Sequence, residues 1–185
     1  CELLLQHGIL AGRYHAGLSL EERKESQDDF TYDRIRVMVA TNAFGMGIDK
    51  SDVALVVHYN MPKDLESYYH EAGRAGRDGG PARCILLYSK GDVRTAEFLI
   101  DHGHEDSELA PEEVEEIRRR DRERLKQMTF YSTTTRCLRH FILSYFGEES
   151  SLHCGHCGNC DAEMDTLDIT CLLYTSPSPR DRSLS

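Results

Sequence analysis

Short apolar runs that alternate with helical segments constrain the fold of this chain more than any other feature. The runs cover residues 11–15, 35–40, 54–59 and 82–88. Runs that are apolar on both faces and alternate with helices predict a parallel sheet covered by helices on each side. Ligands of such sheets meet the loops that follow the carboxyl ends of the strands, and loop 41–50 lies at such an end. The predicted fold class is therefore α/β.

Capping residues predict where the helices of this sheet begin. Gly8 ends a first helix that opens the chain. Ser19 and Glu22 have the spacing of a capping box, which predicts a helix to about residue 30. Asp64 and Ser89 are N-cap residues for two further helices, the second of which continues through residue 100.

A glycine-rich stretch with two arginines, residues 69–78, follows the third apolar run. Arg74 and Arg77 lie three positions apart between glycines, so on a helical turn they would share a face. Arginine suits phosphate because its planar fork donates two parallel hydrogen bonds and keeps its charge at any working pH. The alternative is that both arginines are solvated residues of a glycine-rich turn.

Four cysteines have the spacing of a metal site. Cys154, Cys157 and Cys160 recur at two-residue intervals, and Cys137 lies seventeen positions upstream of Cys154. Zinc takes four soft ligands in a tetrahedron, and four protein ligands leave no open position for water, so the predicted role is structural. An iron–sulfur cluster is the chemical alternative, and free thiols are a third reading.

Two histidines lie beside these cysteines in the sequence. His153 and His156 could replace a thiol. The remaining cysteines are not expected to bind the metal: Cys1, Cys84 and Cys171.

The charge of the chain is unevenly distributed. The formal net charge is −10, which argues against a protein whose whole surface attracts nucleic acid. Acidic residues crowd positions 105–116, and basic residues follow over 118–139, within predicted helices 111–128 and 133–146. Only local basic patches could hold DNA, and most of these charges are expected to form a solvated helix face. The apolar stripe of helix 133–146 is expected to be core.

The hydropathy of the chain bears on its cellular location, and its first residue bears on whether it is a fragment. No run of 18 or more apolar residues and no signal peptide occur, which predicts a soluble intracellular protein that is not secreted. Cysteines in that compartment are expected to be thiols or metal ligands. The chain opens on Cys1, within a helix entered part-way, so we expect a fragment.

Residues 37–49 and 69–78 resemble motifs V and VI of superfamily 2 helicases, and the strings ATNAFGMGIDK and ESYYHEAGRAGRDG resemble the RecQ family of DNA helicases in particular. The resemblance covers about residues 1–170. It implies a RecA-like helicase C-terminal lobe, incomplete at its N-terminus, over 1–103. A small helical zinc-binding domain follows over 104–165. Residues 166–185 would be a truncated winged-helix start and a tail that we expect to be non-native.

The resemblance also implies roles for individual residues. Arg77 would be the arginine finger, with Arg74 beside it. Gly47 and Asp49 would line the nucleotide side of motif V. The residues expected to face DNA are Thr41, Asn42 and His15, although a histidine such as His15 is more often packed or capping. The metal would be structural Zn²⁺ on Cys137, Cys154, Cys157 and Cys160. His70 stands where the family usually has glutamine.

The implied function is that of an ATP-dependent 3′-to-5′ DNA helicase that unwinds DNA in replication, recombination and repair. Its partners would be ATP and DNA, single-stranded and at duplex junctions, with no membrane. It would be cytoplasmic and nucleoid-associated in a bacterium, or nuclear in a eukaryote. ATP and Mg²⁺ would be bound mainly by the N-terminal lobe. This chain has no G-x-x-x-x-G-K-[ST] loop, so by itself it is expected to be inactive. The alternative is a non-catalytic, zinc-containing nucleic-acid-binding module.

Overall fold

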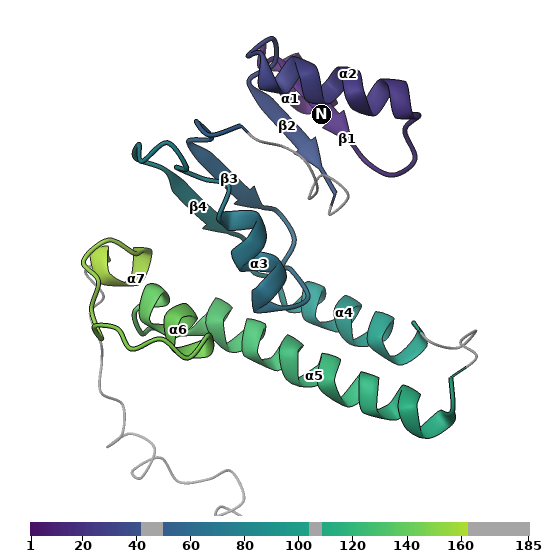
Figure 1. Ribbon diagram of the computed structural model, residues 1–185, viewed down its shortest axis with the longest axis vertical. Helices are drawn as coiled ribbons and strands as arrows, with labels where there is room; N and C mark the ends of the chain where they lie inside the picture. The colour runs from purple at the N-terminus through teal and green to yellow at the C-terminus, as the bar shows by residue number, and fades with distance from the viewer. Residues whose placement is uncertain (42–49, 104–108, 163–185) are drawn as a thin grey trace, which may run out of the picture. The chain divides into compact units, whose positions relative to one another are not determined.

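The computed structural model describes residues 1–41, 50–103 and 109–162 (Figure 1). The chain divides into two compact units, residues 1–132 and residues 133–185. The first unit contains the four strands. The second contains the four clustered cysteines.

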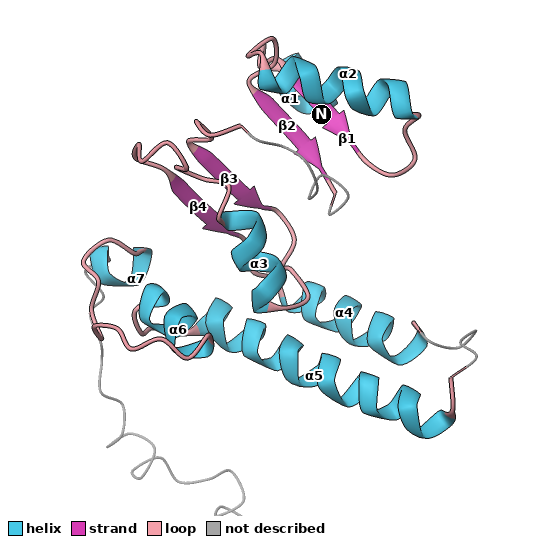
Figure 2. Ribbon diagram, viewed as in Figure 1, coloured by secondary structure: helices cyan, strands magenta, loops and turns pink. Residues whose placement is uncertain are grey.

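The first strand pair is a β-α-β arrangement. Helix α1 (Glu2–Gln6) leads to strand β1 (Ala11–Tyr14), helix α2 (Leu20–Thr31) and strand β2 (Val37–Ala40). Strands β1 and β2 are parallel, and α2 packs against β1 (Figure 2). The predicted capping box at Ser19 is confirmed, since its hydroxyl accepts from the N–H of Glu22 and the Glu22 carboxylate accepts from the N–H of Ser19.

The second strand pair repeats the arrangement. Strand β3 (Leu55–His58), helix α3 (Leu65–Ala72) and strand β4 (Arg83–Leu86) follow one another, and β3 and β4 are parallel. Asp64 caps α3 as predicted, accepting from the N–H of Ser67 at 2.7 Å. The parallel pairing predicted from the apolar runs is confirmed.

The expectation that helices cover both faces of these strands is wrong for the described residues. Val39, Leu55, Val57 and Ile85 are 40–52% exposed. Each described sheet has only two strands, and so small a sheet offers too little area for helices to bury both of its faces.

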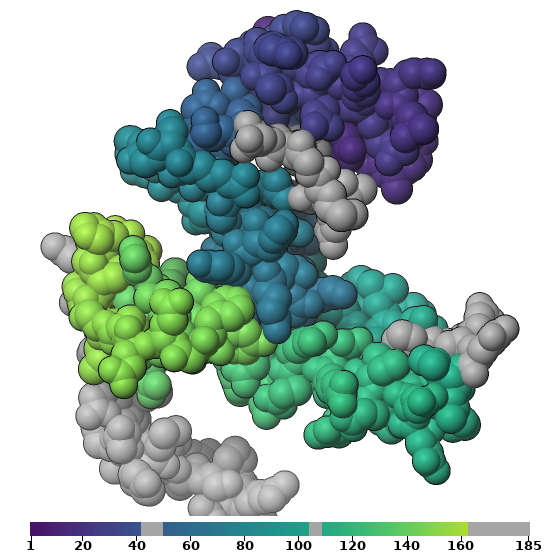
Figure 3. Space-filling view, viewed as in Figure 1, coloured from purple at the N-terminus to yellow at the C-terminus, as the bar shows by residue number. Residues whose placement is uncertain are grey.

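The buried core of the first unit lies where α3 meets helix α5 (Pro111–Thr133). The side chains of Leu65 on α3 and Met128 on α5 are the largest fully buried ones. Helix α4 (Lys90–His102) lies beside α5 (Figures 1 and 3). The predicted end of α5 near residue 128 is wrong, because burial of Met128 and Tyr131 carries the helix on to Thr133. No helix of the described ranges is both long and apolar enough to span a membrane.

The second unit is built on two short helices, α6 (Leu138–Tyr145) and α7 (Gly158–Asp161). The prediction that α6 begins at residue 133 is wrong, because Cys137 is its N-cap and its sulfur accepts from the N–H of His140. The stripe expected to be core is only half-buried: Leu138, Phe141, Ile142 and Tyr145. Gly147, at φ +83°, follows the C-cap and ends the helix as predicted.

Candidate arginine turn and metal centre

The two arginines lie in a turn, residues 73–78, that we call the arginine turn. Helix α3 ends at its C-cap Gly73, so both arginines lie beyond the helix in the glycine-rich turn and not on a helical turn. Ala75 instead forms a parallel bridge with Val53, and the N–H of Gly76 donates to the Val53 carbonyl at 3.0 Å. The arginine turn is therefore fixed to the chain segment that enters β3.

Glycine is required at the centre of this turn. Gly76 has φ +67°, a backbone conformation that costs other residues energy. A Cβ there would also lie 3.1 Å from both the Ala82 Cβ and the Gly80 carbonyl oxygen. The backbone conformation at Gly76 thus sets the path of the chain between Arg74 and Arg77.

The two guanidinium groups influence each other. Burial, followed by repulsion from the charge of Arg77, lowers the pKa of Arg74, and the Glu71 carboxylate opposes the shift. Arg77 is exposed, and its Nε donates to the carbonyl of Gly73 at 3.2 Å. Two like charges that repel each other favour an anion between them, which is the electrostatic condition for a phosphate site.

The structure brings together two of the three residues expected to face DNA. His15 follows β1, Thr41 follows β2, and the N–H of Thr41 donates to the Tyr14 carbonyl at 3.1 Å. Both residues therefore lie at the carboxyl edge of this strand pair, where ligands of parallel sheets bind. The His15 ring packs over Gly17, since a Cβ at Gly17 would lie 3.2 Å from His15 Nδ1.

Three of the predicted site residues, Asn42, Gly47 and Asp49, lie outside the described residues. The chain is described again from Lys50, whose side chain pairs with two carboxylates. Its Nζ lies 2.8 Å from an Asp33 carboxylate oxygen and 3.0 Å from one of Asp52, and its side chain is 9% exposed. The hydrogen bond to Asp33 raises the pKa of Lys50, so the residue stays charged.

The four predicted metal ligands converge in the second unit. The sulfur atoms of the cysteine cluster (Cys137, Cys154, Cys157 and Cys160) all lie within 4.8 Å of one another. The separation is 4.0 Å between Cys154 and Cys160 and also between Cys137 and Cys157. Gly155, at φ +70°, allows the tight knuckle between the first two sulfurs of the C-x-x-C-x-x-C segment.

This spacing fits one zinc ion. Zn–S bonds of about 2.3 Å in a tetrahedron place the sulfurs roughly 3.8 Å apart, close to the separations in the cluster. In a [4Fe–4S] cluster each thiolate binds a different iron, and in a [2Fe–2S] cluster the thiolates bind two irons in pairs, so in either case the four sulfurs would not all lie as close together as they do. His153 and His156 are exposed and are not part of the cluster.

Backbone N–H groups donate hydrogen bonds to two of the sulfurs, which favours the thiolate form that binds a cation. The N–H of Leu138 donates to the Cys157 sulfur at 3.4 Å, and the N–H of His140 donates to the Cys137 sulfur at the same distance. Burial opposes ionisation of Cys157, but hydrogen bonds from the N–H groups of Leu138 and Cys160 and from the thiols of Cys160 and Cys154 outweigh it and lower the pKa of Cys157 to about 6. Burial and the nearby thiols raise the pKa of Cys160 to about 11. The backbone donors thus favour the thiolate at Cys157, and a bound cation would stabilise thiolates at all four sulfurs.

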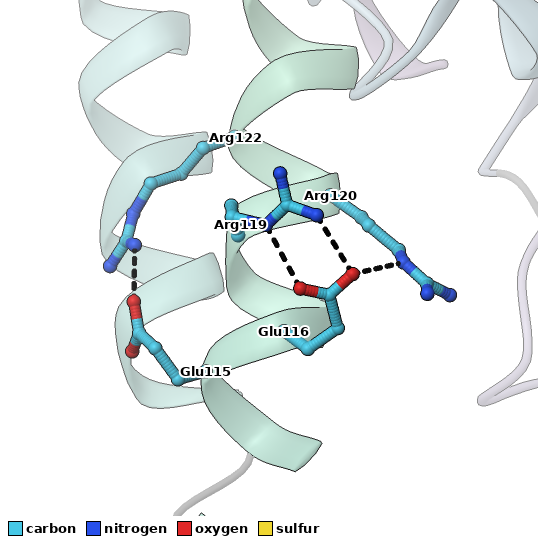
Figure 4. Close-up of polar contacts among 5 residues, drawn as sticks. All are labelled: Glu115, Glu116, Arg119, Arg120 and Arg122. Carbon is cyan, nitrogen blue, oxygen red and sulfur yellow. Dashed lines mark hydrogen bonds and ion pairs between the residues drawn. The ribbon is translucent and has the colours of Figure 1, made fainter. Parts of the chain in front are cut away.

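The basic helix proves to be largely neutralised by its own acids. Glu116 accepts from Arg119 and Arg120 at 2.9 Å, and Arg122 pairs with Glu115 (Figure 4) and with Asp101 of α4. Hydrogen bonds from Arg119 and then from Arg120 lower the pKa of Glu116 to about 2. The expectation of a solvated, self-paired face holds for these residues.

Two features of the sites escaped the sequence analysis. The first is a buried contact between His58 and Glu71 of α3, with 2.9 Å between Nε2 and Oε2. The second is Asn159, whose amide donates to the carbonyls of Thr134 and Arg136 at 2.8 and 2.7 Å. Both connect residues distant in sequence, so only a predicted tertiary arrangement could have revealed them.

The described residues thus form an α/β lobe with parallel strands, followed by a unit that carries four clustered cysteines. Residues 1–79 match the family model described as the helicase conserved C-terminal domain, and residues 90–161 match the model for RecQ zinc-binding. The predicted fold class and the zinc-binding character of the second unit are confirmed.

Relatives with curated names extend the match. The chain is 48% identical over 169 residues, 91% of its length, to the ATP-dependent DNA helicase RecQ of Bacillus subtilis. It is 44% identical over 150 residues, 80% of its length, to the ATP-dependent DNA helicase hus2/rqh1 of Schizosaccharomyces pombe. A third relative, RecQ of Haemophilus influenzae, is 37% identical over 180 residues, 94% of the chain. The chain belongs to the RecQ family, and it spans 27%, 11% and 28% of the lengths of these three relatives.

Proposed function

We propose that this chain is part of an ATP-dependent 3′-to-5′ DNA helicase that acts in replication, recombination and repair. Residues 1–103 would be its C-terminal motor lobe, and residues 104–165 its zinc-binding domain. The observation that supports the proposal is the bridge between Ala75 and Val53, which ties the turn that carries Arg74 and Arg77 to the segment that enters β3.

The proposed chemistry is phosphoryl transfer from ATP to water. Negative charge spreads over the oxygens of the transferring group, and a guanidinium placed there stabilises that charge, which is worth about 10³-fold or more in rate. Arg77, exposed at the end of the turn, is the proposed finger, with Arg74 beside it. Gly47 and Asp49 would line the nucleotide, while ATP and Mg²⁺ would be held mainly by the N-terminal lobe.

The proposed DNA contacts lie at the carboxyl edge of β1 and β2. His15 and Thr41, with Asn42, would face the backbone of single-stranded DNA or of a duplex junction. The zinc ion would hold the second unit together and take no part in chemistry, since four protein ligands leave no open position. Such a protein would work in the bacterial cytoplasm, at the nucleoid, or in a nucleus.

A chimera tests this function, because the chain alone has no phosphate loop and is expected not to hydrolyse ATP. Residues 1–162 would replace the matching segment of the Bacillus subtilis relative, and DNA-stimulated ATP hydrolysis would be measured. Arg77→Ala should lower kcat by about two or more decades while the affinities for nucleotide and DNA change little. Arg77→Lys should rescue poorly, since an ammonium keeps the charge and loses the fork.

The control is Arg83→Ala, which removes an exposed arginine from the start of β4 and should leave kcat unchanged. A loss under about tenfold for Arg77→Ala, which is ~1.4 kcal/mol, is too small for a finger and contradicts the proposal. A loss confined to DNA affinity would place Arg77 on the nucleic-acid side. A parent chimera that binds DNA without hydrolysing ATP would favour the non-catalytic module instead.

A further inference from the structure

A buried lysine fixes the chain segment to which the arginine turn is bonded. The Lys50 side chain is 9% exposed, and its Nζ lies 2.8 Å from a carboxylate oxygen of Asp33 and 3.0 Å from one of Asp52. The same Nζ lies 5.5 Å from the centroid of the Phe30 ring. Phe30 lies in the last turn of α2 and Asp33 just beyond it, so Lys50 joins the end of α2 to the segment that enters β3.

The arginine turn is bonded to the same segment. The N–H of Gly76 donates to the carbonyl of Val53 at 3.0 Å. The N–H of Asp78 donates to the carbonyl of Ser51 at 3.1 Å. Ser51 directly follows Lys50, and Asp78 directly follows the proposed finger. One backbone hydrogen bond therefore connects the residue beside the lysine to the residue beside the finger.

Packing alone does not explain the charge of Lys50. Removing an ammonium from water costs free energy, and a buried ion pair is often no more stabilising than apolar residues of similar volume. Asp33 also has φ +58°, a backbone conformation that few residues other than glycine adopt, although aspartate tolerates it better than most. What the ammonium and its two carboxylates provide is a defined geometry, because each holds the others at hydrogen-bonding distance.

We propose that Lys50 is a positioning residue for the arginine turn: its ion pairs with Asp33 and Asp52 fix segment 50–53, and this segment fixes the backbone from which Arg77 extends. The inference rests on the proposed function, in which Arg77 is the finger. With the ion pairs in place, the carbonyls of the segment are fixed acceptors for the turn. Without them, the segment can shift and the turn with it, and a displacement of about 1 Å near the chemistry is costly in rate.

The kinetic test removes the charge and then restores it. In the chimera, Lys50→Met keeps an unbranched side chain beside Phe30 but loses both ion pairs. It should lower kcat about tenfold or more while KM for ATP changes less than about threefold. Lys50→Arg keeps the charge and should restore kcat to within about threefold of the parent. A Lys50→Met kcat within about twofold of the parent overturns the proposal.

The matched control is Arg34→Gln, which breaks the exposed ion pair of Arg34 with Asp29 beside the same turn. It leaves segment 50–53 untouched, so kcat should not change. An equal loss in Arg34→Gln would show that any ion pair at the end of α2 has this effect, which overturns the specific role of Lys50.

A milder variant keeps the proposal testable if Lys50→Met does not fold. Asp33→Asn keeps the shape of the side chain and its tolerance of positive φ but removes one of the two charges beside Lys50, and should lower kcat about threefold or more. Added to Lys50→Met, it should cost less than a further factor of about two, because the ion pair is already broken. A parent-like kcat in Asp33→Asn, or losses that multiply in the double variant, overturn the proposal.

Hydrogen exchange tests the fixing of the turn without hydrolysis. In the 185-residue chain, the amides of Gly76 and Asp78 should exchange about tenfold or more faster in Lys50→Met than in the parent, because their acceptors are released. The amide of Thr41, which donates to the Tyr14 carbonyl at 3.1 Å, should change little. Equal acceleration of all three amides indicates a purely structural role and overturns the proposal.

The exchange measurement also separates this inference from the proposed function. Unchanged exchange at Asp78 overturns the positioning role even if the chimera hydrolyses ATP. An inactive parent chimera with the expected exchange counts against the proposed function alone.

Discussion

Substitution of Asn159 should weaken zinc binding although this residue is not a ligand. Asn159 lies between Cys157 and Cys160, and its amide donates to the carbonyls of Thr134 and Arg136 at 2.8 and 2.7 Å. Those two carbonyls belong to the irregular segment that leads from α5 into Cys137. The amide thus connects the knuckle that supplies three sulfurs to the segment that supplies the fourth.

The expected loss of zinc affinity follows from the two hydrogen bonds that the Asn159 amide donates. A hydrogen bond contributes a net ~0.5–1.5 kcal/mol, so two contribute about 1–3 kcal/mol. Thr134 is half-buried and Arg136 is exposed, so water can replace part of what the carbonyls lose, which favours the range of about 1–2 kcal/mol. Because ~1.4 kcal/mol is tenfold in affinity, Asn159→Ala should weaken zinc binding roughly 5- to 30-fold.

Competition with a chromophoric chelator at fixed pH and salt measures this affinity. Asn159→Asp should be at least as damaging as Asn159→Ala, because a carboxylate keeps the shape but sets negative charge against two carbonyl oxygens. His156→Ala is the matched control, since it shortens an exposed side chain of the same knuckle. An Asn159→Ala affinity within about twofold of the parent, or an equal loss in His156→Ala, would refute the reasoning.

Two further outcomes are expected. The chain should bind one zinc ion, and the Cys137→Ser variant should lose the zinc and unfold the module, because a structural zinc contributes ~10 kcal/mol or more to folding. The control Cys84→Ser should change neither the zinc content nor the folding. Brown iron–sulfide absorbance in place of zinc would contradict the ligand set. Glu116 should titrate near pH 2 in a carboxyl NMR titration, so its stabilising contribution is complete above its usual pKa of 4.5 and is lost as the pH falls from there toward 2. Arg119→Gln should raise that midpoint, and a parent midpoint near 4.5 would show that the pairs with Arg119 and Arg120 do not persist in solution.

Local chemistry made much of the fold predictable. The capping box at Ser19 and the N-cap at Asp64 depend on residues within three positions of each other, and both occur as expected. The cysteine cluster was predictable for a similar reason, because three of its four sulfurs come from one seven-residue knuckle. Parallel pairing followed from the alternation of apolar runs with helices.

The features that were not predicted correctly depend on contacts between elements that are distant in the sequence. The end of α5 was placed too early because burial of Met128 and Tyr131, which extends the helix, depends on packing against α3. The bridge of the arginine turn to Val53 was not predicted, because it joins positions 22 apart and no local signal marks such a bond. The contact of His58 with Glu71 lay beyond sequence reasoning for the same reason.

The charges on α5 bear on whether this helix could by itself be a docking surface for DNA. A phosphate that binds Arg119, Arg120 or Arg122 must first displace the carboxylates of Glu115, Glu116 or Asp101, which exchanges one anion for another. Exposed ion pairs are weak, about 0–1 kcal/mol each, so displacement is feasible. The released carboxylates remain nearby, however, and repel the same phosphates, so little is gained from counterion release. In the arginine turn, burial and then repulsion from Arg77 lower the pKa of Arg74, so an anion bound near both arginines would relieve part of that repulsion. The ion pairs on α5 therefore argue against this helix as a strong docking surface for DNA by itself.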